Sequence, residues 1–252
     1  MRLCARRSVA TTDAQATAGA DDLCVRRLEA LLSRHLADAR GREVVFVSHC
    51  LLDENARYLG GAFHPGAVPE MIDLLGRGVG VYQMPCPEQR AWGGLLKRRM
   101  LRAYGLRDSA LYPLRGALFR LFVWHTQIRY RLMAGRVARD IEDCHRAGVR
   151  VLGVVGVGCS PSCGVNTTLD LRRSFEAMAA CPLALVDRAT INERVVVACR
   201  AAGEGLFIRT LRRQVTRRHI DVPFLEYDLI AEMRGLPQPE SLVALADRQT
   251  GV

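Results

Sequence analysis

The sequence predicts an α/β fold, a single domain with a parallel, Rossmann-like sheet and flanking helices. Short apolar runs at residues 43–48, 79–84 and 149–157 are typical of buried strands. Segments with helical spacing of apolar residues precede or separate these runs, and such alternation indicates parallel strands joined by crossover helices. A 252-residue chain that is 49% hydrophobic and 25% charged can bury one sizeable core.

We expect residues 1–24 to form a disordered N-terminal tail and residues 25–252 to form the α/β domain. Helices are expected over residues 23–40, from Pro69 to about Gly76, and from about residue 111 to 147 with an interruption near Gly135. Further strands are expected at residues 183–186, 205–208 and 222–228.

The composition argues against a membrane or secreted protein. No apolar run approaches the roughly 18 residues that a membrane span needs, and the N-terminus lacks the apolar region of a secretion signal. We therefore expect a cytoplasmic protein without a membrane partner. In a reducing compartment, nine cysteines are more often metal ligands or catalytic groups than disulfides.

Positive charge is concentrated between residues 97 and 139, where eleven basic residues accompany one acidic residue, Asp108. The net charge of the chain is +10. One interpretation is an acidic partner such as a nucleotide or a nucleic acid. The other is a solvated helix face, since no nucleic-acid-binding motif accompanies the charges.

Cysteines follow three of the expected strands. Cys50 comes just after the first strand, Cys86 lies between two prolines after the second, and Cys159 and Cys163 follow the third in "GCSPSCG". Ligands of open parallel sheets bind beyond the carboxyl ends of the strands. We therefore expect Cys50, Cys86 and Cys163 to meet at that edge.

Converging thiolates favour zinc, copper(I) or an iron–sulfur cluster. Zinc sites usually have paired cysteines or added histidines, and neither pattern is clear here. Three dispersed cysteines suit a [4Fe–4S] cluster with one iron lacking a protein thiolate, which can act as a Lewis acid. If Cys159 were a fourth ligand, the site would be closed. Buried, inert thiols are the remaining alternative.

The segments "VSHCLLDENARY", "QMPCPEQRAWGG" and "CSPSCG" together resemble the 2-thiouracil desulfidase family, over about residues 43–170. The resemblance implies a [4Fe–4S] cluster held by Cys50, Cys86 and Cys163. It also implies proton transfer by Glu88 and a role for a serine, Ser160 or alternatively Ser162. The implied reaction is non-redox: water replaces the sulfur of a thiolated pyrimidine, and sulfide leaves through the open iron.

Several residues near these motifs have two interpretations. Asp53, Asn55 and Arg57 follow Cys50 and are our candidates for contacting the base edge. Glu88 has a structural alternative, an ion pair with an arginine, and the serines have one as helix caps. Tyr58 and Trp92 either stack on a base or pack in the core.

Two classes of function remain at this point. The first is desulfuration of a thiolated nucleobase, a nucleotide, or a thiolated RNA bound through residues 97–139. The second is a non-catalytic iron–sulfur or zinc protein that transfers electrons or binds nucleic acid.

Overall fold

A computed structural model describes residues 23–238. Contacts divide the chain into two compact units, Met1–Gly41 and Arg42–Val252. In the first unit residues 23–35 are helical, so the expected boundary after residue 24 falls inside a helix. That helix ends before residue 40 because Ala37 has a left-handed backbone, with φ of 48°. Residues 1–22, most of the expected tail, lie outside the described residues.

The second unit confirms the predicted α/β fold. Four strands form one sheet in the order β2-β1-β3-β6, and all neighbouring pairs are parallel. Their bounds are Glu43–Val47 for β1, Gly80–Gln83 for β2, Arg150–Val157 for β3 and Phe224–Tyr227 for β6. The first three apolar runs and the run at 222–228 are therefore strands, as predicted.

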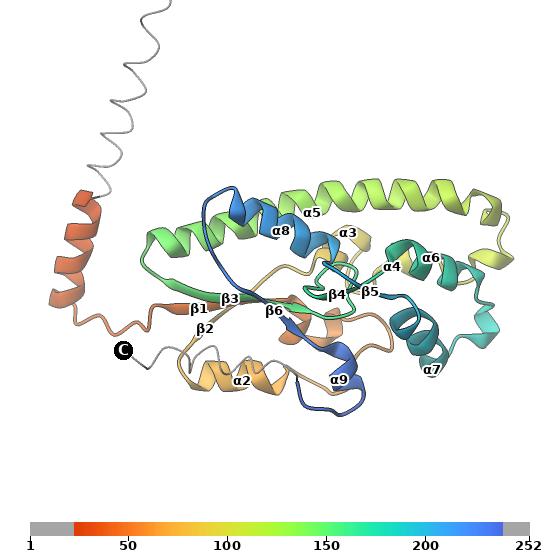
Figure 1. Ribbon diagram of the computed structural model, residues 1–252, viewed down its shortest axis with the longest axis horizontal. Helices are drawn as coiled ribbons and strands as arrows, with labels where there is room; N and C mark the ends of the chain where they lie inside the picture. The colour runs from red at the N-terminus through yellow and green to blue at the C-terminus, as the bar shows by residue number, and fades with distance from the viewer. Residues whose placement is uncertain (1–22, 239–252) are drawn as a thin grey trace, which may run out of the picture. The chain divides into compact units, whose positions relative to one another are not determined.

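Helices cover both faces of the sheet (Figure 1). One face carries α5 (Arg115–Arg146) and α8 (Leu206–Thr216), and the other carries α2 (Pro69–Gly76) and α9 (Leu229–Met233). Side chains of the central strands alternate between the two sides, because successive strand residues point in opposite directions. Phe46 packs toward α5 and α8, whereas Val45 and Val47 pack toward α2.

Two expected strands are wrong, and both are helical. Residues 183–185 form a 3-10 helix, η5 (Leu183–Leu185). The run at 205–208 is the start of α8, because its apolar residues continue at helical spacing through Leu211 and Val215 and form one buried face. The expected break at Gly135 is also absent, and α5 runs through it without interruption.

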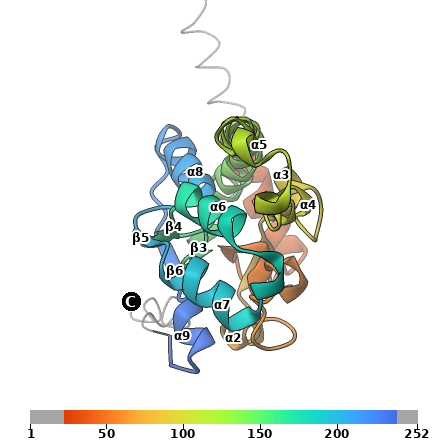
Figure 2. The ribbon, with the colours of Figure 1, turned by 90° about the vertical axis from the view of Figure 1, so that its right-hand side faces the viewer.

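The remaining elements of this unit lie mostly in the connections that follow the strands. They are η1 (His49–Leu51), η2 (Glu54–Ala56), α3 (Pro87–Trp92), α4 (Arg98–Leu101), η3 (Leu106–Asp108), η4 (Tyr112–Leu114), β4 (Thr167–Leu169), α6 (Leu171–Ala180), α7 (Arg188–Ile191), the π-helix η6 (Asn192–Val197) and β5 (Arg200–Ala202). Figure 2 shows α3, α4, α6 and α7 gathered in front of the sheet. Strands β4 and β5 form a separate antiparallel pair.

Among residues 23–238, no helix combines the length and the apolar character needed to cross a membrane.

Gly156 allows the chain after β3 to fold back against the strand. A β-carbon at this position would collide with the carbonyl oxygen of Cys163 and with the Val165 side chain. The same carbonyl accepts a hydrogen bond of 2.9 Å from the Val157 N–H. The close approach of these two backbone segments therefore requires glycine.

We predict that Gly156→Ala lowers the free energy of unfolding by about 1–3 kcal/mol, because backbone atoms cannot yield as a flexible side chain can. Gly135→Ala is the matched control: a β-carbon there meets nothing within 4 Å, inside a regular helix. It should raise stability by about 0.5–1 kcal/mol. Urea unfolding of both variants measures the difference, and equal effects would contradict the role given to Gly156.

A candidate metal and acid–base site at the carboxyl edge of the sheet

The structure brings Cys50, Cys86 and Cys163 to one cavity at the carboxyl edge of the sheet. Cys50 lies in η1 after β1, Cys86 is the N-cap of α3 after β2, and Cys163 lies in the loop after β3. Burial raises the pKa of Cys163 well above its ordinary value, and the charges of Cys50 and Cys86 raise it further. Burial and then Cys86 raise the pKa of Cys50 to about 12. The three thiols therefore share one cavity.

The chemistry of this donor set fits an iron–sulfur cluster. Within residues 23–238, no three Cys, His, Asp or Glu side chains gather tightly enough to hold one metal ion. In a [4Fe–4S] cube each thiolate binds a different iron, so its ligands stand farther apart than those of a single ion. The buried Ser48 hydroxyl faces Cys163 closely enough to lower its pKa, yet it makes no full hydrogen bond to the described residues. Such an unpaired donor suits a cluster sulfur.

The serines of "SPSCG" shape the loop that carries Cys163. The Ser160 hydroxyl accepts hydrogen bonds from the N–H groups of Ser162 and Cys163, at 3.3 and 2.9 Å. This is the local turn that a serine side chain commonly stabilises. The alternative role of the serines as helix caps is wrong, because a strand, β4, and not a helix follows Gly164. Ser160 instead stabilises the loop, and it also lines the cavity.

Glu226 in β6 anchors the far end of the same loop. Its Oε2 accepts hydrogen bonds from the N–H groups of Val165, Asn166 and Thr167 at 2.8, 2.6 and 2.9 Å. Its Oε1 accepts the Thr167 hydroxyl at 2.7 Å. Glu226 is buried, and its charge is spread over four donors. Sequence reasoning missed this residue, since it lies about 60 positions from its partners.

Cys159 also lines the cavity, but its side chain packs in different surroundings from those of the three other thiols. It packs in an apolar cluster with Leu106, Leu169 and Met178, which contains none of Cys50, Cys86 and Cys163. Its Sγ lies 3.9 Å from Thr167 Oγ1, and its N–H donates to the same hydroxyl at 3.1 Å. A left-handed backbone, with φ of 58°, produces this direction. The geometry therefore does not favour Cys159 as a fourth ligand.

Glu88 lies beside the cysteines and forms a buried ion pair with a lysine rather than with an arginine. Lys97 Nζ is 2.7 Å from Glu88 Oε2, and both side chains are almost fully buried. The Ser162 hydroxyl donates to Glu88 Oε1 at 3.0 Å, and Ser160 does so at 3.5 Å. Tyr130 shares a hydrogen bond of 2.6 Å with Ser162. Ser162 thus orients the carboxylate, whereas Ser160 is the serine that borders the cavity.

Lys97 is the functional candidate that sequence reasoning overlooked. Burial alone would lower its pKa, but the charges of Glu88 and Cys86 outweigh burial and raise the pKa above its ordinary value. The sequence does contain a signal: Lys97 is the only lysine among 36 basic residues. A lysine carries a compact point charge, which suits a confined pocket better than the wide guanidinium group of arginine.

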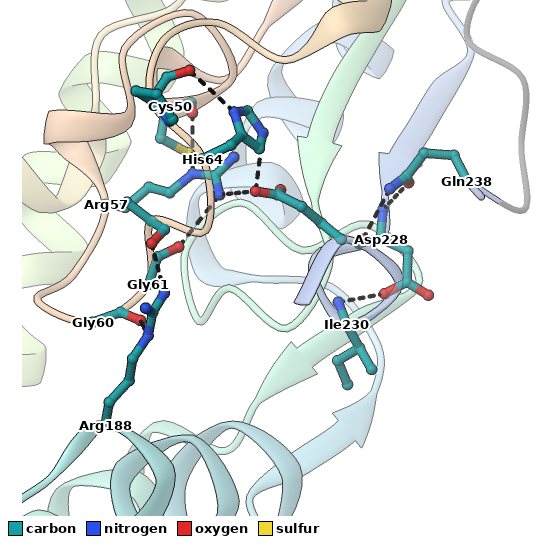
Figure 3. A network of polar contacts seen from close by, with 12 residues as sticks. Cys50, Arg57, Gly60, Gly61, His64, Arg188, Asp228, Ile230 and Gln238 are labelled. Atoms are coloured by element: carbon teal, nitrogen blue, oxygen red, sulfur yellow. Dashed lines mark hydrogen bonds and ion pairs between the residues drawn. The ribbon is translucent and has the colours of Figure 1, made fainter. Parts of the chain in front are cut away.

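The three residues proposed to contact the base have different surroundings. Arg57 lines the cavity, but its guanidinium donates a hydrogen bond of 2.6 Å to Glu232. It also donates to the carbonyl oxygen of Gly61 (Figure 3). Asn55 also lines the cavity. Asp53 is not part of the lining: it caps η2, and hydrogen bonds from Asn55 hold its pKa below the ordinary value.

The two aromatic candidates line the cavity and are tied to the scaffold. Trp92 is buried and its indole N–H donates to Thr126 at 3.1 Å. The Tyr58 hydroxyl donates to Asn192 at 3.0 Å. Burial raises the pKa of Tyr58 to about 12, so its ring remains neutral.

The basic segment 97–139 has two kinds of member. Lys97 is buried against Glu88, whereas all ten arginines of the segment are exposed. The exposed arginines are Arg98, Arg99, Arg102, Arg107, Arg115, Arg120, Arg129, Arg131, Arg136 and Arg139.

The cavity around these groups has a volume of about 590 Å³. No family model, curated protein or solved structure matches this chain.

We predict that Lys97→Met lowers the free energy of unfolding by about 3–5 kcal/mol, because it leaves the buried Glu88 charge without a partner. The double variant with Glu88→Gln should lose less than Lys97→Met alone. Arg172→Met, which breaks an exposed pair with Glu176, should cost no more than about 1 kcal/mol. Denaturant unfolding of the four proteins tests the pair, and a Lys97→Met effect as small as the Arg172→Met effect would refute it.

Glu226→Gln should destabilise the protein by about 2–4 kcal/mol, because an amide places N–H donors where a carboxylate accepted charge-assisted hydrogen bonds. Hydrogen exchange should show lost protection at Val165, Asn166 and Thr167. Glu176→Gln is the exposed control. Unchanged exchange at the three amides would mean that Glu226 does not anchor the loop.

Proposed function

We propose that this protein removes sulfur from a thiolated pyrimidine similar to 2-thiouracil, with a [4Fe–4S] cluster held by Cys50, Cys86 and Cys163. One observation carries the proposal: these three thiols, the Glu88 carboxylate and the Ser160 hydroxyl border the same cavity. Motif resemblance supports the same assignment, because the three matching segments contribute all five residues.

The proposed reaction is a hydrolysis without net oxidation or reduction. Water adds its oxygen to the carbon that carries sulfur, the C–S bond breaks, and the products are the oxo base and hydrogen sulfide or its anion. When bound, the cluster supplies a soft iron that stabilises the departing sulfur as a Lewis acid.

Glu88 is the group that transfers protons in this proposal. Its Oε2 is paired with the Lys97 ammonium, which allows an ionised carboxylate to remain in a buried position. Its Oε1 accepts from Ser162 and Ser160, so the carboxylate has a fixed direction. A carboxylate held in this way can take a proton from the attacking water and return it to the leaving sulfur.

Ser160 is proposed to contact the substrate, because its hydroxyl both borders the cavity and reaches Glu88 at 3.5 Å. Arg57 and Asn55 also border the cavity and remain candidates for contacts to the base. Arg57 forms an ion pair with Glu232, so its role would be to hold this side of the cavity in place rather than to bind a charged group of the substrate.

The location and the partner are part of the proposal. The eight cysteines within residues 23–238 are all free thiols, which suits the reducing cytoplasm. A thiolated RNA is a variant substrate that the ten exposed arginines between residues 98 and 139 favour.

The cluster is tested by anaerobic reconstitution with iron and sulfide. We expect a sulfide-to-iron charge-transfer band that is lost in Cys50→Ser, Cys86→Ser and Cys163→Ser. Cys159→Ser should retain the band, and Cys181→Ser serves as a buried control outside the cavity. Binding of zinc without this band, or loss of the band in Cys159→Ser, would contradict the assignment.

The chemistry is tested by sulfide release from 2-thiouracil with the reconstituted protein. Glu88→Gln should lower the rate by about 100-fold or more while retaining the cluster band, and Glu176→Gln should not change it. No release from any thiolated base or thiolated RNA would favour the second class, a non-catalytic iron–sulfur or zinc protein that transfers electrons or binds nucleic acid.

A further inference from the structure

The cavity extends far beyond the groups that would do the chemistry. Its volume of about 590 Å³ lies within the range of roughly 300–1,000 Å³ found for pockets that enclose drug-sized ligands. A bare thiopyrimidine is much smaller than such a ligand. The reacting groups come from the segments after β1, β2 and β3, so the remaining space must be explained by the other walls.

Those other walls are apolar and come from four separate elements. Leu96 and Met100 line the cavity before and within α4, Met178 lines it from α6, and Ile191 and Val195 line it from α7 and η6. The element η6, which carries Val195, is a π-helical turn and is wider than a regular α-helical turn. Such turns are frequent at functional sites. This part of the cavity offers mainly hydrocarbon surface to an occupant.

The charged side chains of the lining are engaged by other protein groups. Arg57 pairs with Glu232, and Lys97 pairs with Glu88. Arg188 donates to the carbonyl oxygens of Gly60 and Ala62, at 3.0 and 2.6 Å. The fifth, Asp187, caps α7 by accepting the N–H and the hydroxyl of Thr190. Among the described residues, each cation of the lining is therefore already paired with a carboxylate or bound to carbonyl oxygens, although the Arg57 Nη2 has no hydrogen-bond partner. This arrangement disfavours a phosphate group as the occupant.

A hydroxyl group in the apolar part of the lining lacks a partner. Ser174 on α6 lines the cavity and is 2% exposed, and its hydroxyl has no hydrogen-bond partner within the described residues. A buried hydroxyl in this state is complementary to a single polar atom of a ligand. Ser174 lies on the same helix as Met178, in apolar surroundings. A ligand atom that bonds to the Ser174 hydroxyl would therefore belong to an otherwise apolar substituent.

We propose that the substrate of this site is an uncharged thiocarbonyl heterocycle carrying an apolar substituent, which occupies the pocket formed by Leu96, Met100, Met178, Ile191 and Val195. The thiocarbonyl part of this proposal rests on the proposed function, whereas the apolar pocket follows from the lining residues alone. Burial of the substituent provides binding energy and excludes water from the reacting end.

Calorimetry on the reconstituted full chain tests the preference, with 6-propyluracil, uracil and uridine 5′-monophosphate as unreactive probes. We expect 6-propyluracil to bind about 10- to 50-fold more tightly than uracil, and the nucleotide no more tightly than uracil. Sulfide release should show the same order for 6-propyl-2-thiouracil, 2-thiouracil and 2-thiouridine 5′-monophosphate.

Met100→Trp should fill part of the pocket and abolish the advantage of the propyl compound over uracil. Leu132→Trp on the exposed face of α5 is the control for an added tryptophan, and it should retain the advantage. A propyl compound that binds no better than uracil, or tighter binding of the nucleotide or of a thiolated RNA, would overturn the inference.

The two proposals can fail separately. If 2-thiouracil releases sulfide but propyl substitution brings no advantage, the proposed function stands and the apolar substrate class is wrong. If 6-propyluracil binds with the expected advantage and no thiolated compound releases sulfide, the apolar pocket stands and the desulfidase proposal is wrong.

Discussion

The arrangement of the site depends on the hydrogen bonds between the Glu226 carboxylate and the loop after β3. Three consecutive N–H groups, of Val165, Asn166 and Thr167, point at one oxygen of a side chain from the neighbouring strand β6. The loop can turn back only because Gly156 lets the Cys163 carbonyl approach β3 closely. Together these constraints hold Cys163 beside Cys50 and Cys86 and turn Cys159 toward Thr167. Because the donors are bound to a charge in a buried position, the loop should keep this conformation without a ligand.

A second constraint is the placement of charge next to apolar surface. The Glu88–Lys97 pair is buried in the lining of the cavity, and the Ser162 and Ser160 hydroxyls fix the direction of the carboxylate. Much of the remaining lining consists of aliphatic side chains. Charges interact strongly where water is excluded, so a single proton-transfer group can be effective there.

The parallel sheet was predictable because its strands are continuous apolar runs that need burial on both faces. Residues 205–208 were misassigned because a short apolar run has no periodicity by which strand and helix differ, and only the spacing out to Val215 identifies α8. Cys50, Cys86 and Cys163 could be grouped in advance, since parallel strands end at one edge. The partners of Glu226 and Glu88 could not, because hydrogen bonds between residues far apart in the chain leave no local pattern.

The sequence by itself determined the α/β class, the strands that carry the cysteines, and the residues available for chemistry. These follow from local patterns of apolar residues and from the position of each motif after a strand. Only the tertiary structure decided which of the two thiols, Cys159 or Cys163, four positions further along, packs beside the other cysteines, because the backbone torsion at Cys159 sets its direction. It also decided that Lys97 is the partner of Glu88, and that Arg57 is held by Glu232. These contacts depend on packing between residues far apart in the chain, so no spacing pattern in the sequence predicts them.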